Sequence, residues 1–76
     1  MTDLFSERLK RMDDATLFQA CIEYGKGLEE HMTVRGFLPI DFRIRAARVY
    51  HEATQRPGLV EHHQLFSVAL SVVAIL

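Results

Sequence analysis

The chain closes on twelve residues that carry no charge, Leu65-Phe66-Ser67-Val68-Ala69-Leu70-Ser71-Val72-Val73-Ala74-Ile75-Leu76. Ten of them are apolar, and removal of apolar surface from water is the main force that folds a small chain. We therefore expect this run to be buried, with the preceding segments as its cover. The residues expected in the core or at a subunit interface are Leu65, Phe66, Val68, Leu70, Val72, Val73 and Leu76.

Two conformations are compatible with this run. As a helix, it is apolar around nearly its whole circumference, and its least apolar line is His63, Ser67 and Ser71. As a strand, its β-branched residues fit a pleated surface. The length of the run and the polar residues 61–64 before it favour a helix over residues 59–76. The strand stays open as the alternative.

Upstream of this run, apolar residues recur at helical spacing. The first such stripe is Phe5, Leu9 and Met12, and a longer one runs from Leu17 to Met32. Together with the closing run, they predict an all-α protein, a single domain built as a small bundle of three to four helices. The expected helices cover residues 3–12, 14–34, 42–56 and 59–76.

Several residues mark the expected helix ends. Asp13-Asp14 is either a break or a new N-cap, so the first two helices could also be continuous. Gly36 is typical of a helix C-cap, and Asp41 is expected to cap the third helix. Pro57-Gly58 is expected to end that helix.

The size of the chain points to association. A domain of about 60 residues buries only about 60% of its unfolded surface, which leaves a single core marginal, and this chain has 76 residues. Cys21 is the only cysteine, so an intrachain disulfide is excluded and a reducing, cytoplasmic setting is expected. No basic and apolar leader suggests secretion. We therefore expect the bundle to be completed by homodimerisation.

Motifs for catalysis are incomplete. Gly25-Lys26-Gly27 lacks the rest of a phosphate-binding loop, and His51-Glu52 has Gln55 where a zinc-protease helix needs its second histidine. His62-His63 are adjacent, so on a helix their side chains diverge. Cys21 lies within an apolar stripe, where cysteine acts as a small hydrophobic residue. We therefore expect no enzyme activity, no cofactor and no metal site.

One cluster could bind a partner. The net charge is −1, yet residues 35–56 hold five arginines against Asp41 and Glu52. Arginine beside exposed apolar residues is typical of protein interfaces. Alternatively, the apolar connector before the third helix folds back onto the core. The expected partner-binding residues are Arg43, Arg45, Arg48, Arg56, Phe37, Leu38 and Ile40.

These observations favour a small cytoplasmic adaptor or inhibitor, a class common among phage and mobile-element proteins, that binds another protein and modulates its activity. The alternative is a dimeric helix-turn-helix-like DNA-binding transcriptional regulator that uses the arginine-rich third helix. Against it stand the negative net charge and a pairing of Arg48 with Glu52 expected at i, i+4 spacing. A membrane span is not expected, because about 20 apolar residues are needed and only twelve run uninterrupted.

Overall fold

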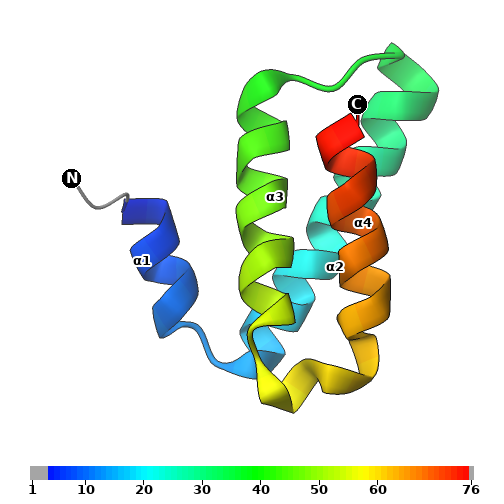
Figure 1. Ribbon diagram of the computed structural model, residues 1–76. Coiled ribbons are helices and arrows are strands. Elements are labelled where there is room, and N and C mark those ends of the chain that lie inside the picture. Colours follow the sequence, from blue (N-terminus) through cyan, green and yellow to red (C-terminus); the bar gives the residue numbers. More distant parts are fainter. Residues whose placement is uncertain (1–3, 76) are drawn as a thin grey trace.

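The computed structural model describes residues 4–75, and within that range the chain is helical and contains no strand (Figure 1). The all-helical prediction is therefore confirmed, and the apolar run is a helix rather than a strand. Leu76 lies outside the described residues. The four α-helices are α1 (Leu4–Arg11), α2 (Asp14–Glu30), α3 (Ile40–Thr54) and α4 (His63–Ile75). A π-helical turn, η1 (His31–Arg35), extends α2, and a 3-10 helix, η2 (Pro57–His62), precedes α4.

The helix ends follow from local chemistry. The Asp13 Oδ1 atom accepts a hydrogen bond from the Thr16 backbone N–H at 2.8 Å, so Asp13 caps α2 and separates it from α1. Gly36 adopts φ 74°, the left-handed conformation of a C-cap, and its N–H donates to the His31 carbonyl oxygen at 2.8 Å. The prediction that Asp41 caps the third helix was wrong. That helix begins at Ile40, after Pro39, so Asp41 lies in its first turn. There its negative charge interacts favourably with the positive end of the helix dipole.

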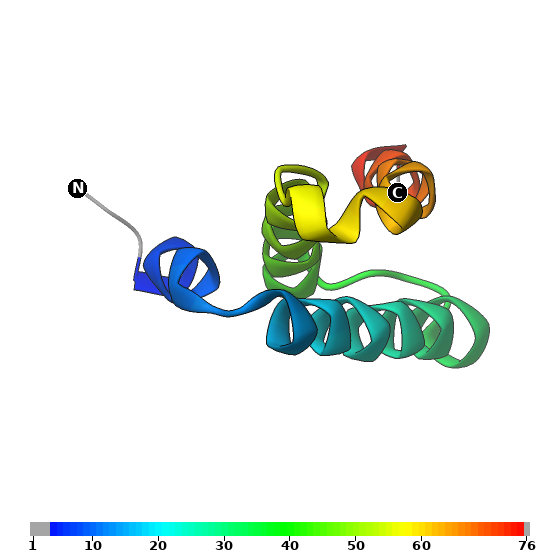
Figure 2. The same cartoon turned by 90° about the horizontal axis from the view of Figure 1, so that it is seen from below.

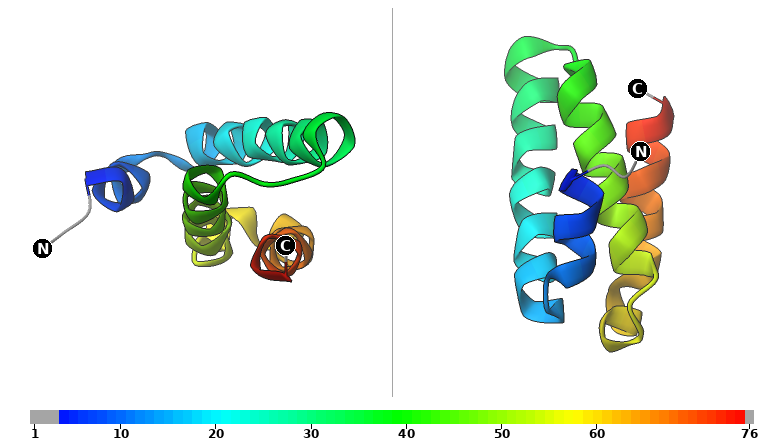
Figure 3. Two further views of the ribbon diagram at one scale, coloured as in Figure 1. Left: turned by 90° about the horizontal axis from the view of Figure 1, so that it is seen from above. Right: turned by 90° about the vertical axis from the view of Figure 1, so that its left-hand side faces the viewer.

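Helix α3 is the centre of the bundle. It contacts α1, α2 and α4, which surround it when the molecule is viewed along its axis (Figures 2 and 3). Its buried face is made largely of small side chains, which allow close approach of the neighbouring helices. This face consists of Ala46, Val49, Tyr50 and Ala53, each at most 3% exposed.

Helix α4 packs mainly against α3. Phe66 and Val73 are its buried residues, and Phe66 approaches the Phe18 ring of α2 with 6.2 Å between the centroids. The closing helix therefore packs chiefly on α3, and Phe66 also brings it against α2. The stripe of α2, including Leu17 and Cys21, packs in the same core as α3.

Arg56 fixes the turn between α1 and α2 to the end of α3. Its Nη1 donates to the Met12 carbonyl oxygen at 2.7 Å, and its Nη2 donates to the Leu9 carbonyl oxygen at 2.8 Å. The same guanidinium pairs with Asp14 at 3.1 Å and with Glu52 at 2.9 Å. These partners include carbonyls in the last turn of α1, where the helix itself supplies few N–H donors.

Two expectations about Arg56 are corrected by this arrangement. Its side chain is 15% exposed and its donors are used inside the fold, so it does not belong to a partner-binding row. The ion pair observed for Glu52 is with Arg56, four residues after it, whereas the expected one was with Arg48, four residues before it. Both choices satisfy i, i+4 spacing, and the packing of α1 decides between them.

Replacement of Arg56 by alanine should lower the free energy of unfolding by about 3 kcal/mol, because it removes the partner of the half-buried Glu52 and the side-chain donor to the Leu9 and Met12 carbonyls. Lysine should restore little, since one ammonium cannot reproduce a planar fork of donors. Urea unfolding followed by circular dichroism measures both variants. Arg35→Ala, at an exposed position of η1, is the matched control and should stay within about 0.5 kcal/mol of the parent. A loss below about 1 kcal/mol for Arg56→Ala would contradict the clamp.

Candidate functional site

The histidines are spread over the structure. His31 lies edge-on against Phe42, with 4.8 Å between the ring centroids, and His62 lies 4.7 Å from the Phe18 ring. The His63 Nε2 atom is 2.7 Å from the Arg56 carbonyl oxygen, and His51 is exposed on α3. Among residues 4–75, no three His, Cys, Asp or Glu side chains are grouped so that they could hold a metal ion.

Cys21 and Tyr50 meet in the core. The Tyr50 hydroxyl donates to the Cys21 carbonyl oxygen at 3.2 Å, which ties α3 to α2. Burial raises the pKa of the Cys21 thiol to about 11, and burial together with the nearby Cys21 raises the pKa of Tyr50 to about 12. Both groups are therefore neutral near pH 7. A neutral, buried thiol is a poor nucleophile.

The outer face of α4 is apolar and largely uncovered. Leu65 is 64% exposed and Val68 55% exposed, and Val72 and Ile75 are also exposed. Of the residues expected in the core or at an interface, Phe66 and Val73 are buried and Leu70 is half-buried. Helix α4 contains no acidic residue, lysine or arginine, so this face carries no fixed charge.

An apolar groove runs between α2 and α4, and we call it the α2–α4 groove. Its volume is about 270 Å³. Gly25 and Ala69 contribute little side-chain volume to its walls, and Tyr50 of α3 lies among its lining residues. The α2–α4 groove is lined by Phe18, Cys21, Ile22, Gly25, Leu28, Tyr50, Leu65, Phe66 and Ala69.

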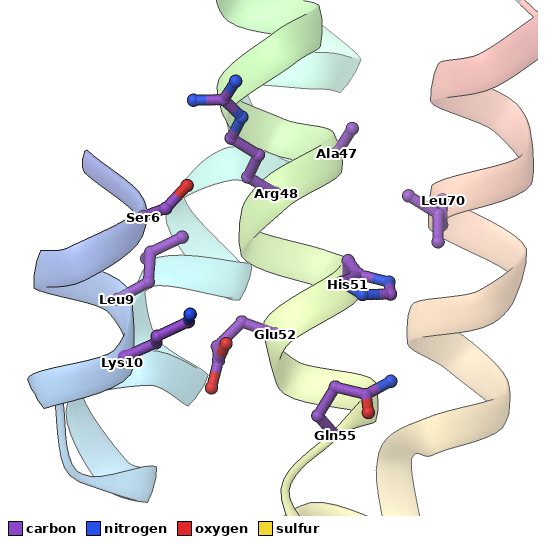
Figure 4. Close-up of a pocket in the computed structure, with 9 residues that line it drawn as sticks. All are labelled: Ser6, Leu9, Lys10, Ala47, Arg48, His51, Glu52, Gln55 and Leu70. Carbon is purple, nitrogen blue, oxygen red and sulfur yellow. The ribbon is translucent and has the colours of Figure 1, made fainter. Parts of the chain in front are cut away.

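A second groove lies over α3, with α1 as one wall and α4 as the other (Figure 4). We call it the α3 groove. Its main hollow has a volume of about 590 Å³ and is lined by Ser6, Leu9, Lys10, Ala47, Arg48, His51, Glu52, Gln55 and Leu70. A smaller hollow of about 170 Å³ adjoins it, because both include Arg48. This hollow is lined by Phe5, Asp41, Ile44, Arg45 and Arg48.

Only some of the arginines expected to bind a partner line the α3 groove. Arg45 and Arg48 line the α3 groove, and the Arg45 guanidinium carbon is 6.0 Å from the centre of the Phe5 ring. Arg43 is half-buried and lines neither hollow of the α3 groove.

The connector before α3 is likewise divided. Leu38 is 8% exposed and belongs to the core, as the fold-back alternative predicts for this residue. Phe37 and Ile40 are exposed. Two anchors of the expected three are therefore accessible, and the third stabilises the bundle.

Several residues of the α3 groove were not predicted from the sequence. Ser6 and Lys10 come from α1, and Leu70 comes from the closing helix. Their convergence depends on how α1 and α4 dock on α3, and neither spacing nor composition encodes that docking. Of the unpredicted residues on α3, His51 and Gln55 follow Arg48 at helical spacing, which is the one signal that could have identified them.

The arrangement of α2 and α3 differs from a helix-turn-helix. The two helices are linked by η1 and residues 36–39, are in contact, and run in opposite directions with α2 oblique to α3 (Figures 1 and 3). In a helix-turn-helix the pair crosses at about 90–120° after a turn of 3–4 residues. The exposed arginines of α3 are also flanked by α1 and α4, which hinders insertion of α3 into a DNA groove.

The stretch Pro57–Ile75, which joins η2 to α4, is long and apolar enough to cross a membrane by length and composition. It includes the polar residues 61–64, and one side of α4 packs on α3. Core helices of soluble proteins have the same composition. The stretch therefore does not distinguish between the two environments.

Comparisons with models of protein families, with curated proteins and with solved structures found no match for this chain.

The two glycines of α2 should respond oppositely to alanine. A Cβ at Gly25 would lie 3.4 Å from the Tyr50 hydroxyl, which is ordinary contact, so Gly25→Ala should stabilise the fold by about 0.5–1 kcal/mol through helix propensity. A Cβ at Gly27 would lie 2.7 Å from Phe42 Cε2, so Gly27→Ala should destabilise by about 1–2 kcal/mol. Urea unfolding at low protein concentration compares them. Equal stability of the two variants would refute the close Gly27–Phe42 packing.

Proposed function

We propose that this protein is a non-enzymatic cytoplasmic homodimer that binds another protein and modulates or inhibits its activity. The observation that carries the proposal is the charge-free, exposed face of α4 beside the apolar α2–α4 groove. Apolar patches of this kind on a soluble protein mark interaction surfaces.

A second copy is the occupant that best suits this face. A two-fold interface pairs a surface with itself, so a face without charge brings no like charges together. Leu65, Val68 and Val72 form a ridge along α4, and Gly25, which has no side chain, is among the residues that line the groove beside it. The ridge of each copy can then enter the groove of the other. The added burial offsets the small core expected of a chain of this length.

The α3 groove would remain open in such a dimer. Leu70 lines the α3 groove, whereas Leu65 and Ala69 line the α2–α4 groove, so α4 is a wall common to both. Arginine beside apolar side chains is enriched at protein interfaces, and Arg45 and Arg48 lie beside Ile44 in this groove. This composition supports the α3 groove, with the exposed Ile40 one turn before Ile44, as the surface for a different protein.

Leu65→Glu should convert the dimer to a monomer, because two-fold pairing would bring buried carboxylates into an apolar interface. Size-exclusion chromatography with light scattering should give twice the chain mass of 8.7 kDa for the parent and the single mass for the variant. The matched control is Val34→Glu, on the exposed η1 turn, which should remain dimeric. Unchanged circular dichroism verifies the fold of each variant. A parent that stays monomeric at about 100 µM would refute the dimer.

Capture of partners from a cell lysate tests the second surface. Arg45→Glu combined with Arg48→Glu should abolish retention of the proteins that the parent captures. The Leu65→Glu variant should instead change the oligomeric state before it affects partner capture. The double variant needs a circular-dichroism check, because Arg48 also has interactions within the fold. Retention that survives the double variant would refute the α3 groove as the partner surface. Retention of DNA that falls steeply with salt would favour the regulator instead.

A further inference from the structure

We infer that the α3 groove receives an acidic, amphipathic helix of the partner protein. The inference rests on the proposed function, because it names the chemistry of the partner that this groove binds. It uses three properties of the groove: the sign of its charge, its apolar floor and its length.

The charged residues that line the groove are mainly cationic. Lys10 projects from α1 and Arg45 belongs to α3, and these two cations are the ones counted here, because Arg48 has interactions of its own within the fold. Of the two carboxylates among the lining residues, Glu52 is held by Arg56 at 2.9 Å and its side chain is 19% exposed. Asp41 is the other. The groove therefore presents an excess of positive charge, although the whole chain has a net charge of −1, and it attracts a segment of opposite sign.

The groove also offers apolar surface between these charges. Ala47 lies on α3 between its two walls, Leu9 belongs to α1, and Leu70 belongs to α4 (Figure 4). Ile44 extends this surface into the smaller hollow and is 46% exposed. An occupant with one apolar face and acidic flanks satisfies both kinds of surface at once, as amphipathic helices do in hydrophobic grooves.

The length of the groove fits a short helix. Ile44, Arg48 and His51 occupy successive turns of the same side of α3, and the C-cap residue Gln55 continues this side. From Ile44 to Gln55 the chain rises by eleven residue steps of about 1.5 Å, or about 16 Å, so a partner helix of about three turns can lie along α3 between α1 and α4.

A phosphate backbone is a poorer occupant than an acidic peptide. The apolar floor would be left without a partner by a phosphodiester chain, and recognition of nucleic acid normally uses a domain with a clear basic excess. Elsewhere on the chain, α2 exposes Glu23, Glu29 and Glu30, which repel a long polyanion. A short acidic helix avoids this repulsion because it contacts the groove alone.

Calorimetric titration of the full-length protein with designed peptides tests the inference. The probe is a 14-residue helical peptide with leucine at positions 1, 4, 8 and 11 and glutamate at the flanking positions, and its control has lysine in place of every glutamate. The acidic peptide should bind with a Kd of about 10 µM, and the lysine peptide should bind at least about 100-fold more weakly. Raising the salt from 0.15 to 0.5 M should weaken binding several-fold, because exposed charges are screened.

Charge reversals in the protein locate the binding surface. Lys10→Glu and Arg45→Glu should each weaken the acidic peptide by about tenfold or more. Arg35→Glu makes the same charge change on the exposed η1 turn and should have an effect of less than about threefold. Lys10→Glu keeps the backbone carbonyl that Arg56 uses, so the clamp is preserved. Far-ultraviolet circular dichroism confirms that each variant is folded.

Three results would overturn the inference: binding of neither peptide, equal binding of the lysine peptide, or displacement of the acidic peptide by a DNA duplex. If lysate capture depends on Arg45 and Arg48 but the acidic peptide does not bind, the proposed function stands and the chemistry assigned to the partner is wrong. If lysate capture does not depend on these arginines but the peptide binds at the groove, the proposed function is at fault.

Discussion

The bundle depends on one guanidinium group that joins parts of the chain far apart in sequence. Helix α1 has only eight residues, which is too short to be stable alone in water. Arg56 gives the carbonyls at its C-terminal end their hydrogen-bond donors across 44 to 47 residues of chain. Because α1 is the outer wall of the α3 groove, the clamp that stabilises the fold also shapes the surface over α3.

Helix α4 shows how a small chain can be all-helical and still leave apolar surface exposed. It is apolar on nearly every side, but α3 covers one side and α2 makes slight contact. The principal extents of 33 × 32 × 18 Å describe a flat arrangement in which α2 and α4 are neighbours of α3 more than of each other. None of the helices within residues 4–75 covers the remaining side. The uncovered side therefore follows from the way α1, α2 and α4 are arranged around α3.

Much of the local structure could be predicted, because helices leave periodic signals in sequence. The stripes beginning at Phe5 and Leu17, and the glycine at position 36, indicate helices and a helix end from neighbouring residues alone. The neighbours of α4 and the role of Arg56 could not be predicted, since an arginine four residues from a glutamate fits a surface row and a buried clamp equally well. The same applies to Lys10 and Leu70, which meet across the α3 groove only after α1 and α4 dock.

The contact between Tyr50 and Cys21 has an optical consequence. The chain contains no tryptophan and two tyrosines, so its ultraviolet emission comes from Tyr24 and Tyr50. The Tyr50 hydroxyl is hydrogen-bonded to the Cys21 carbonyl and lies among the residues of the α2–α4 groove. Emission of a phenol depends on its hydrogen bonding and on the polarity around it. The native chain thus carries its own chromophore in this groove, and no dye or engineered indole is needed to observe whether the groove is filled.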